Sequence, residues 1–236
     1  MKSVLANNFT FLNGFRNFFY QLKPYSAKFK GYYLTGKWTK VETEAEHIET
    51  VSGPGSTLSA TQVIREQLPQ LFKTFSIRTV VDLPCGDFHW MKEVDLRGID
   101  YQGFDIVQDL IDANISKYQT DNIKFGCLDM IKDEIPKAEL IVCRDCLIHY
   151  SNKFIIKAIK NMKKSGSSYI LTTTYTTVDV NKEIDAIGLS RPINLEKPPF
   201  NFPKPIYLID EKIEEERKGI IDRKSSALWR LDDINI

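Results

Sequence analysis

The chain has 236 residues, of which 42% are hydrophobic, and its 32 basic and 31 acidic residues leave a formal net charge of +1. This length supports one sizeable hydrophobic core and leaves little room for two full domains. The balanced charge, with no evident basic face, argues against a nucleic-acid partner. No stretch approaches the roughly 18 apolar residues of a membrane span, and no signal peptide begins the chain, so a cytoplasmic location is expected.

Residues 1–50 form an aromatic-rich N-terminal extension. Part of it has helical spacing, which predicts an amphipathic helix. That helix could pack on the main domain, cover a substrate as a lid, or form a homodimer contact. Binding to a membrane surface is a weaker alternative because the polar face is only weakly basic. The positions with helical spacing are Phe11, Phe15, Phe18, Phe19 and Leu22.

Residues 51–236 form the main domain. It opens with a Gly/Pro/Ser loop at 52–56, which a helix follows through about residue 75. Ser56 or Ser59 is expected to cap this helix at its N-terminus. Pro69 is expected to kink or restart it, because proline has no amide proton to donate.

Short apolar segments then alternate with helical segments. This alternation predicts a Rossmann-like α/β fold, with a mostly parallel sheet and helices on both faces. The run at 140–143 is wholly apolar, which is typical of a buried parallel strand. The expected strands are 79–83, 101–105, 123–127, 140–143 and 169–174, and the expected helices are 88–94, 110–118 and 152–164, the last capped by Ser151.

The C-terminal part has a different pattern. A proline-rich connector at 190–205 is followed by two predicted strands, 206–210 and 227–231, with a charged segment at 211–218 between them. These strands are expected to close the sheet as an antiparallel hairpin. Added to the five strands before them, they give a seven-stranded sheet.

The four cysteines are Cys85, Cys127, Cys143 and Cys146. The last two form a C-x-x-C pair, which is found in zinc and redox sites. Zinc requires four ligands, and no second pair lies at a suitable spacing. We therefore interpret all four as reduced core thiols and predict no metal site.

The most informative segment is the turn at 83–87, which follows a buried strand. Ligands of parallel sheets bind outside the carboxyl ends of the strands, and Gly86 permits close approach of the backbone. Asp105 ends the next strand, about 20 residues later, at the spacing that suits a carboxylate bound to ribose hydroxyls. Asp129 follows the third strand and could accept from an exocyclic amine, with Met130 packed on the base. Each aspartate could instead be an ordinary turn residue.

The loop after the fourth strand, Arg144 to Tyr150, would lie beside the reacting group. His149 is a candidate general base, since its ordinary pKa is near 6.5, although a structural histidine is an equal alternative. Asp145 could orient a substrate or the cofactor. Arg144 could anchor an anion or pair with Asp145.

Together these segments resemble the class I S-adenosylmethionine-dependent methyltransferases. Residues 82–87 are similar to the first motif of that family, 101–105 to the second, 127–130 to the adenine-side motif and 140–149 to the fourth strand and its loop. The P-C-G-D-F and C-R-D-C-L-x-H segments resemble a bacterial subgroup. The resemblance implies S-adenosyl-L-methionine as cofactor, with Asp82 or Asp87 facing its amino group. The implied cofactor-binding residues are Asp82, Pro84, Cys85, Gly86, Asp87, Asp105, Ile106, Asp129, Met130 and Arg144.

The turn departs from the family pattern at Pro84, where a glycine is usual. Proline removes a backbone donor, which disfavours a pyrophosphate ligand and therefore a nicotinamide-dependent oxidoreductase. The predicted function is methyl transfer to oxygen of a small molecule or glycan, with His149 and Asp145 catalytic. Tyr150, Tyr175 and Arg191 are the expected substrate contacts. The alternatives are N- or C-methylation and non-catalytic cofactor binding.

Overall fold

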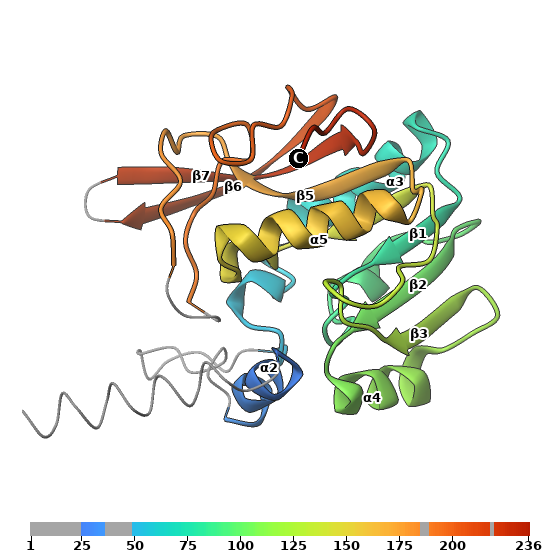
Figure 1. The fold of residues 1–236 in the computed structure, drawn as a ribbon. Helices are drawn as coiled ribbons and strands as arrows, with labels where there is room; N and C mark the ends of the chain where they lie inside the picture. Colours follow the sequence, from blue (N-terminus) through green and yellow to red (C-terminus); the bar gives the residue numbers. More distant parts are fainter. Residues whose placement is uncertain (1–24, 36–48, 185–188, 218–219) are drawn as a thin grey trace, which may run out of the picture.

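The computed structural model describes residues 25–35, 49–184, 189–217 and 220–236. Its centre is a seven-stranded sheet with the order β3-β2-β1-β4-β5-β7-β6 (Figure 1). The parallel strands are β1 (Thr79–Asp82), β2 (Asp100–Asp105), β3 (Ile123–Cys127), β4 (Leu140–Cys143) and β5 (Tyr169–Tyr175). The closing strands β6 (Tyr207–Arg217) and β7 (Ile220–Arg230) are antiparallel. The predicted Rossmann-like sheet with a terminal hairpin is confirmed.

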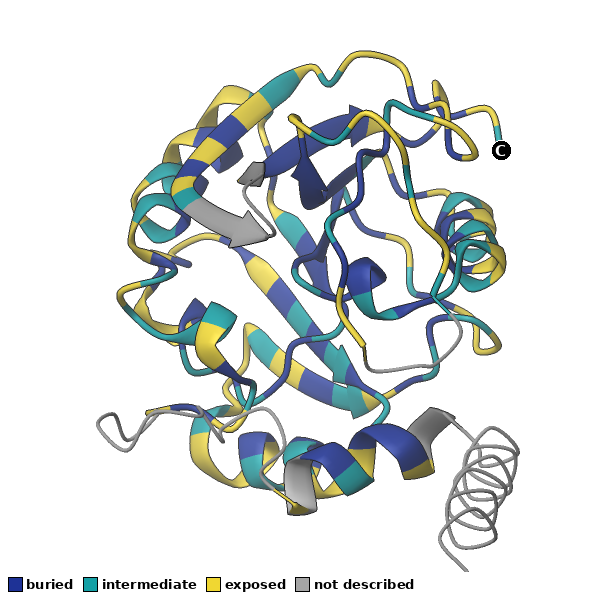
Figure 2. Ribbon diagram, turned by 90° about the vertical axis from the view of Figure 1, so that its left-hand side faces the viewer, coloured by how far each residue is buried: buried dark blue, intermediate teal, exposed yellow. Residues whose placement is uncertain are grey.

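Two hydrophobic cores cover the two faces of this sheet. Helix α5 (Asn152–Lys164) lies on one face, and α3 (Gln62–Thr74) and α4 (Gln108–Tyr118) pack on the other (Figure 1). Neighbouring residues of a strand point to opposite faces, so Val81 belongs to the first core and Val80 to the second. Figure 2 shows the central strands mostly buried and the outer sides of the helices exposed.

Several predicted boundaries are wrong. Helix α3 begins after Thr61, not after Ser56 or Ser59, and it continues past Pro69. Ser151 does occupy the N-cap position of α5, but its side chain makes no capping hydrogen bond. The predicted helix 88–94 is only a 3-10 turn at Met91–Glu93. Phe88 has a φ of 58°, outside the helical region.

The charged segment at 211–218 does not separate the last two strands. Strand β6 continues through it to Arg217, and β7 already begins at Ile220. One edge of β6 is unpaired in the sheet, and such an edge strand tolerates charged residues while its backbone pairs with β7.

The N-terminal part that the structure describes contains α2 (Tyr25–Leu34). Phe29 and Tyr32 of this helix are buried in the same core as α5. Lys30 pairs with Asp109 of α4 across 2.8 Å. The helix predicted over 11–22 lies outside the described residues.

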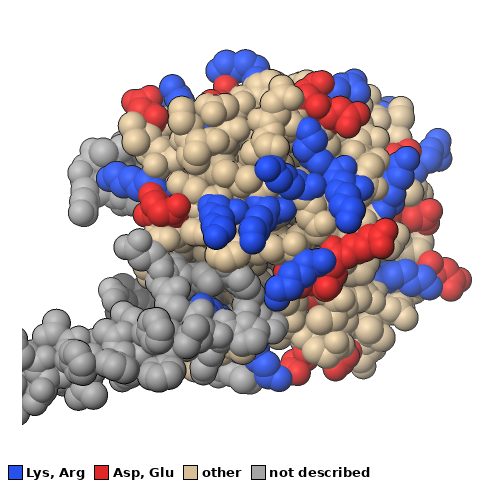
Figure 3. Space-filling view, in the orientation of Figure 1, with Lys and Arg blue, Asp and Glu red and all other residues tan. Residues whose placement is uncertain are grey.

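Basic side chains gather on the face of the molecule over which α5 runs (Figure 3). The exposed lysines of α5 are Lys153, Lys157, Lys160 and Lys164. The expectation that no basic face exists is therefore wrong for this helix. Within the residues described, no helix combines the length and apolar character needed to cross a membrane.

Candidate cofactor and active site

A cavity of about 420 Å³ lies where the strand order reverses, beside the carboxyl ends of β1 and β4. Ligands of open α/β sheets bind at such a switch point, and this volume is typical of small-molecule sites. Asp129 and Arg191 are outside its lining. The predicted residues that do line it are Asp82, Pro84, Cys85, Gly86, Asp87, Asp105, Ile106, Met130, Arg144, Asp145, His149, Tyr150 and Tyr175.

The turn after β1 uses its own amides within the protein. Cys85 N–H donates to the Phe104 carbonyl at 2.8 Å, and Gly86 N–H donates to Asp105 Oδ2 at 3.3 Å. Asp87 N–H donates to the Ser52 hydroxyl at 3.1 Å. With proline at position 84, the turn therefore does not present the row of amides that a phosphate requires.

Two buried carboxyl groups lie beside this turn. Asp82 accepts a hydrogen bond from the Tyr101 hydroxyl at 2.7 Å, and burial raises the pKa of Asp82 to about 7. Asp105 accepts from Val107 N–H at 2.9 Å as well as from Gly86, and burial raises the pKa of Asp105 to about 6. Buried carboxyl groups with raised pKa values are typical of functional sites.

Asp87 is already engaged by the preceding loop. Its carboxylate accepts from the Thr50 hydroxyl at 2.7 Å, from Val51 N–H at 2.9 Å and from the Ser52 hydroxyl at 2.9 Å. Of the two aspartates expected to face the cofactor's amino group, Asp82 has fewer protein partners. Asp82 is therefore the better candidate.

The side of the cavity beside β2 and β3 is apolar. Ile106, Leu128 and Met130 line it, as a base ring requires. Asp129 instead accepts from Ile131 N–H at 2.9 Å and pairs with Lys132 at 3.0 Å. These contacts hold the Asp129 carboxylate in its own turn.

The loop after β4 places His149 in the cavity wall. Its Nδ1 lies 3.3 Å from the Leu189 carbonyl oxygen, so Nδ1 carries the proton and Nε2 has the basic lone pair. Burial lowers the pKa of His149, which favours the neutral imidazole. Burial raises the pKa of Asp145, but Arg144 and Lys224 outweigh this effect and hold it at about 2.

Arg191 has a different position from the one the sequence indicates. Its guanidinium donates to the Lys182, Ile148 and Tyr150 carbonyls at 2.7, 3.1 and 2.7 Å, and to Asn152 Oδ1 at 2.8 Å. These bonds tie the proline-rich connector to the loop after β4. The side chain therefore supports the cavity wall and is not part of its lining.

Three of the residues around the site that sequence reasoning missed lie far along the chain from its motifs. Phe29 lines the cavity from α2, although α2 is distant in sequence from the sheet. Lys224 lines it from β7, and Glu211 of β6 is buried behind it. No local signal in the sequence marks the last two, because only the β6–β7 hairpin brings them to the site. The expected core position of Cys127 is also wrong, because that thiol is exposed.

No family model matches the chain. The ubiquinone biosynthesis O-methyltransferases of two Rickettsia bellii strains are 23% identical to it over 190 residues, 73% of this chain and 77% of theirs. The fold is similar to that of TehB from Haemophilus influenzae, with a TM-score of 0.50, 19% identity and coverage of 70% of this chain and 61% of that one. It is also similar to magnesium protoporphyrin IX methyltransferase (ChlM) from Synechocystis PCC 6803 with bound SAH, with a TM-score of 0.54, 11% identity and coverage of 84% and 96%.

The sequence likeness to the two O-methyltransferases and the shared fold agree with the motifs and their placement around the cavity. Together, the distant sequence relatives and the shared fold support assignment of the chain to the class I S-adenosylmethionine-dependent methyltransferase superfamily. The resemblance drawn from residues 82–149 is confirmed at that level.

Proposed function

We propose that this chain transfers a methyl group from S-adenosylmethionine to an oxygen atom of an uncharged small molecule or glycan, with His149 as general base. The observation that carries the proposal is the position of His149 in the wall of a cavity that also contains Asp82 and Asp105, with its Nδ1 3.3 Å from the Leu189 carbonyl oxygen. The names of the sequence relatives, which are O-methyltransferases, support oxygen as the acceptor atom.

The residues present fit this cofactor. Asp82 suits an ammonium group, Asp105 suits ribose hydroxyls, and Leu128 with Met130 suits an adenine ring. The amides of the turn are used within the protein, which suits a ligand without phosphate. When bound, S-adenosylmethionine supplies a methyl group on a positively charged sulfur.

The chemical role of the protein is then to orient the acceptor and to take its proton. Nε2 of His149 has the lone pair for a hydroxyl proton, because Nδ1 faces the Leu189 carbonyl. Positioning of the two reactants supplies much of the rate in such reactions. Asp145 is held by Thr173 as well as by its cationic neighbours, so we assign it to shaping the wall beside His149.

The lining favours an acceptor without charge. Arg144 and Lys224, the cations that line the described part of the cavity, are paired with acidic side chains, and Arg191 is outside the lining. A carboxylate or phosphate on the acceptor would therefore have to displace an existing ion pair. Tyr150 and Tyr175 provide aromatic surface for a ring or sugar.

The test compares His149→Ala with His89→Ala, a histidine outside the cavity lining. Binding of SAH is measured by calorimetry, and transfer of labelled methyl is measured to a panel of phenols and glycosides. For His149→Ala we expect SAH affinity within about twofold of the unchanged chain and a rate loss of about 100-fold or more. His89→Ala should retain both.

The outcomes separate the alternatives. Label on nitrogen or carbon of the product would refute transfer to oxygen but would leave the assignment to the methyltransferase superfamily unchanged. Tight SAH binding with no transfer to any acceptor would favour a non-catalytic cofactor-binding protein. Full turnover by His149→Ala would refute the assignment of His149 as general base.

A further inference from the structure

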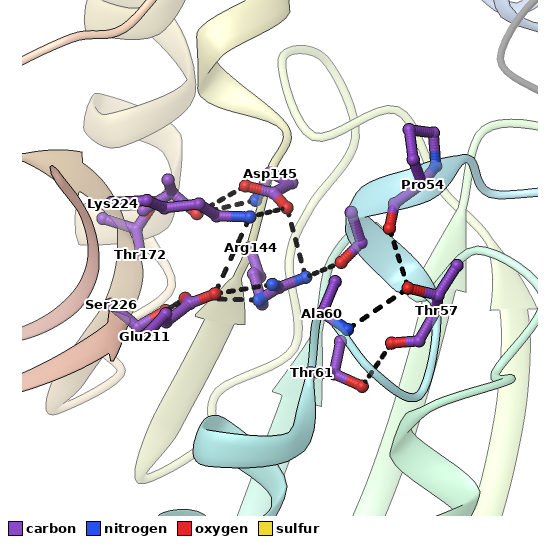
Figure 4. Close-up of polar contacts among 12 residues, drawn as sticks. Pro54, Thr57, Ala60, Thr61, Arg144, Asp145, Thr172, Glu211, Lys224 and Ser226 are labelled. Carbon is purple, nitrogen blue, oxygen red and sulfur yellow. Dashed lines mark hydrogen bonds and ion pairs between the residues drawn. The ribbon is translucent and has the colours of Figure 1, made fainter. Parts of the chain in front are cut away.

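Four charged side chains form a buried cluster beside the cavity (Figure 4). Arg144 and Asp145 follow β4, Glu211 lies in β6 and Lys224 lies in β7. The Arg144 and Lys224 side chains are each 4% exposed and that of Glu211 is 1% exposed. Two cations face two anions, so the cluster presents no excess charge to a ligand. Its inferred role is therefore to position neighbouring parts of the protein.

Glu211 determines how the Arg144 guanidinium is oriented. Its two oxygens lie 2.6 Å from Nη2 and 3.3 Å from Nε, a two-pronged contact that fixes the plane of the guanidinium. Ser226 of β7 donates to Glu211 Oε1 at 2.5 Å and holds the carboxylate in turn. Glu211 is outside the cavity lining, so any effect on a bound ligand must pass through its neighbours.

Arg144 connects this cluster to a turn from the start of the main domain. Its Nη1 donates to the Gly55 carbonyl oxygen at 2.7 Å. A Cβ atom on Gly55 would lie 2.6 Å from Asp145 Oδ2, so the turn packs directly against the cluster and a side chain there would displace the Asp145 carboxylate. Residues 53–56 of this turn line the cavity.

The other end of the same segment is held by Asp87. Its carboxylate binds Thr50, Val51 and Ser52, as described above. The segment 50–56 is therefore fixed at one end by the turn after β1 and at the other by the loop after β4. Both anchoring points are themselves part of the cavity lining.

We propose that Glu211 is a positioning residue for cofactor binding, which acts through Arg144 to hold the 53–56 turn as a wall of the cavity. The inference rests on the proposed function for the identity of the cofactor, and it concerns binding, not methyl transfer. Without the Glu211 carboxylate, Arg144 and Lys224 would share the single anion Asp145. The Gly55 carbonyl would then lose its oriented donor.

The experiment measures SAH affinity by calorimetry for Glu211→Gln, which preserves shape and removes the charge. We expect the affinity to fall about tenfold, as for a lost charge-assisted hydrogen bond. Asp210→Asn, an exposed acid of the same strand, is the matched control and should bind SAH normally. In an Arg144→Met background, Glu211→Gln should cause no further loss, because the two side chains act as one unit.

Gly55→Ala tests the same contact from the side of the turn, in case Glu211→Gln does not fold. It should weaken SAH binding while thermal stability changes little. Normal SAH affinity in folded Glu211→Gln or in Gly55→Ala would overturn the proposal, as would an undiminished effect of Glu211→Gln in the Arg144→Met background. Absence of SAH binding by the unchanged chain would instead refute the proposed function.

Discussion

Binding of SAH should strengthen as the pH rises from about 6 to about 7.5, because Asp82 must ionise to bind an ammonium group. Burial raises the pKa of Asp82 to about 7 in the ligand-free cavity, and the hydrogen bond from Tyr101 only partly opposes this effect. A bound cation favours the carboxylate, so the ligand and the proton compete for the same site.

The magnitude follows from the pKa of the ligand-free state. With a pKa of about 7, roughly one Asp82 side chain in ten is ionised near pH 6, and most are ionised near pH 7.5. The affinity should therefore change about tenfold over this range. Asp105, whose pKa burial raises to about 6, adds a factor of about two at the acidic end.

Calorimetry in two buffers of different ionisation enthalpy measures the SAH affinity and the number of protons released on binding, because proton release appears as a buffer-dependent heat. Asp82→Asn should bind SAH weakly at every pH and should lose most of the pH dependence. An affinity that is flat from pH 6 to 7.5 in the unchanged chain would refute the assignment of Asp82. So would an Asp82→Asn variant that keeps the full slope.

The ligand-free protein should show the opposite trend. The folded-state pKa of Asp82 is raised above its unfolded value of 3.8, so its contribution to stability is fully present below about pH 4 and is lost as the pH rises through about 7. A shift from 3.8 to about 7 corresponds to on the order of 4 kcal/mol. Asp82→Asn should therefore raise the free energy of unfolding at pH 8, measured with urea, and bound SAH should reverse the trend in the unchanged chain.

Two further substitutions test the walls of the cavity. Arg191→Met removes four hydrogen bonds from a buried guanidinium and should lower the free energy of unfolding by about 3 kcal/mol in urea; an unchanged midpoint would show that the connector does not depend on it. Phe29→Ala removes a ring that lines the cavity and whose centroid lies 5.7 Å from the centroid of the Tyr150 ring, so SAH affinity should fall about fivefold. Lys30→Ala, on the same helix, breaks only an exposed ion pair and should have no effect; equal losses in both variants would instead implicate the docking of α2 as a whole.

The parallel part of the fold was predictable because each strand carries a local signal. The run at 140–143 is apolar at every position, and all four residues of β4 are buried. The ends of these strands fix where their loops meet, which is why Asp82, Asp105 and His149 were found together. The extent of β6 was not predictable, because an edge strand tolerates charges that otherwise indicate a loop.

The cluster around Arg144 could not be predicted from the sequence either. Glu211 and Lys224 have meaning only once the β6–β7 hairpin places both beside the loop after β4. Nothing local distinguishes them from the other charged residues of that hairpin. Arg191 shows the converse. A basic residue near a predicted site was assigned to the ligand, whereas its guanidinium binds three backbone carbonyls and the Asn152 side chain.

The single glycine of the turn after β1 now has a physical explanation. A glycine-rich turn is needed where backbone amides must approach a phosphate, but here the amides of Cys85, Gly86 and Asp87 are bonded to acceptors of the protein. Gly86 is still required because its φ is 55°. Proline can replace a glycine at position 84 because no donor is needed there. A cavity that offers carboxylates in place of amides selects a cationic nucleoside over a dinucleotide, so the departure from the usual motif supports the family assignment.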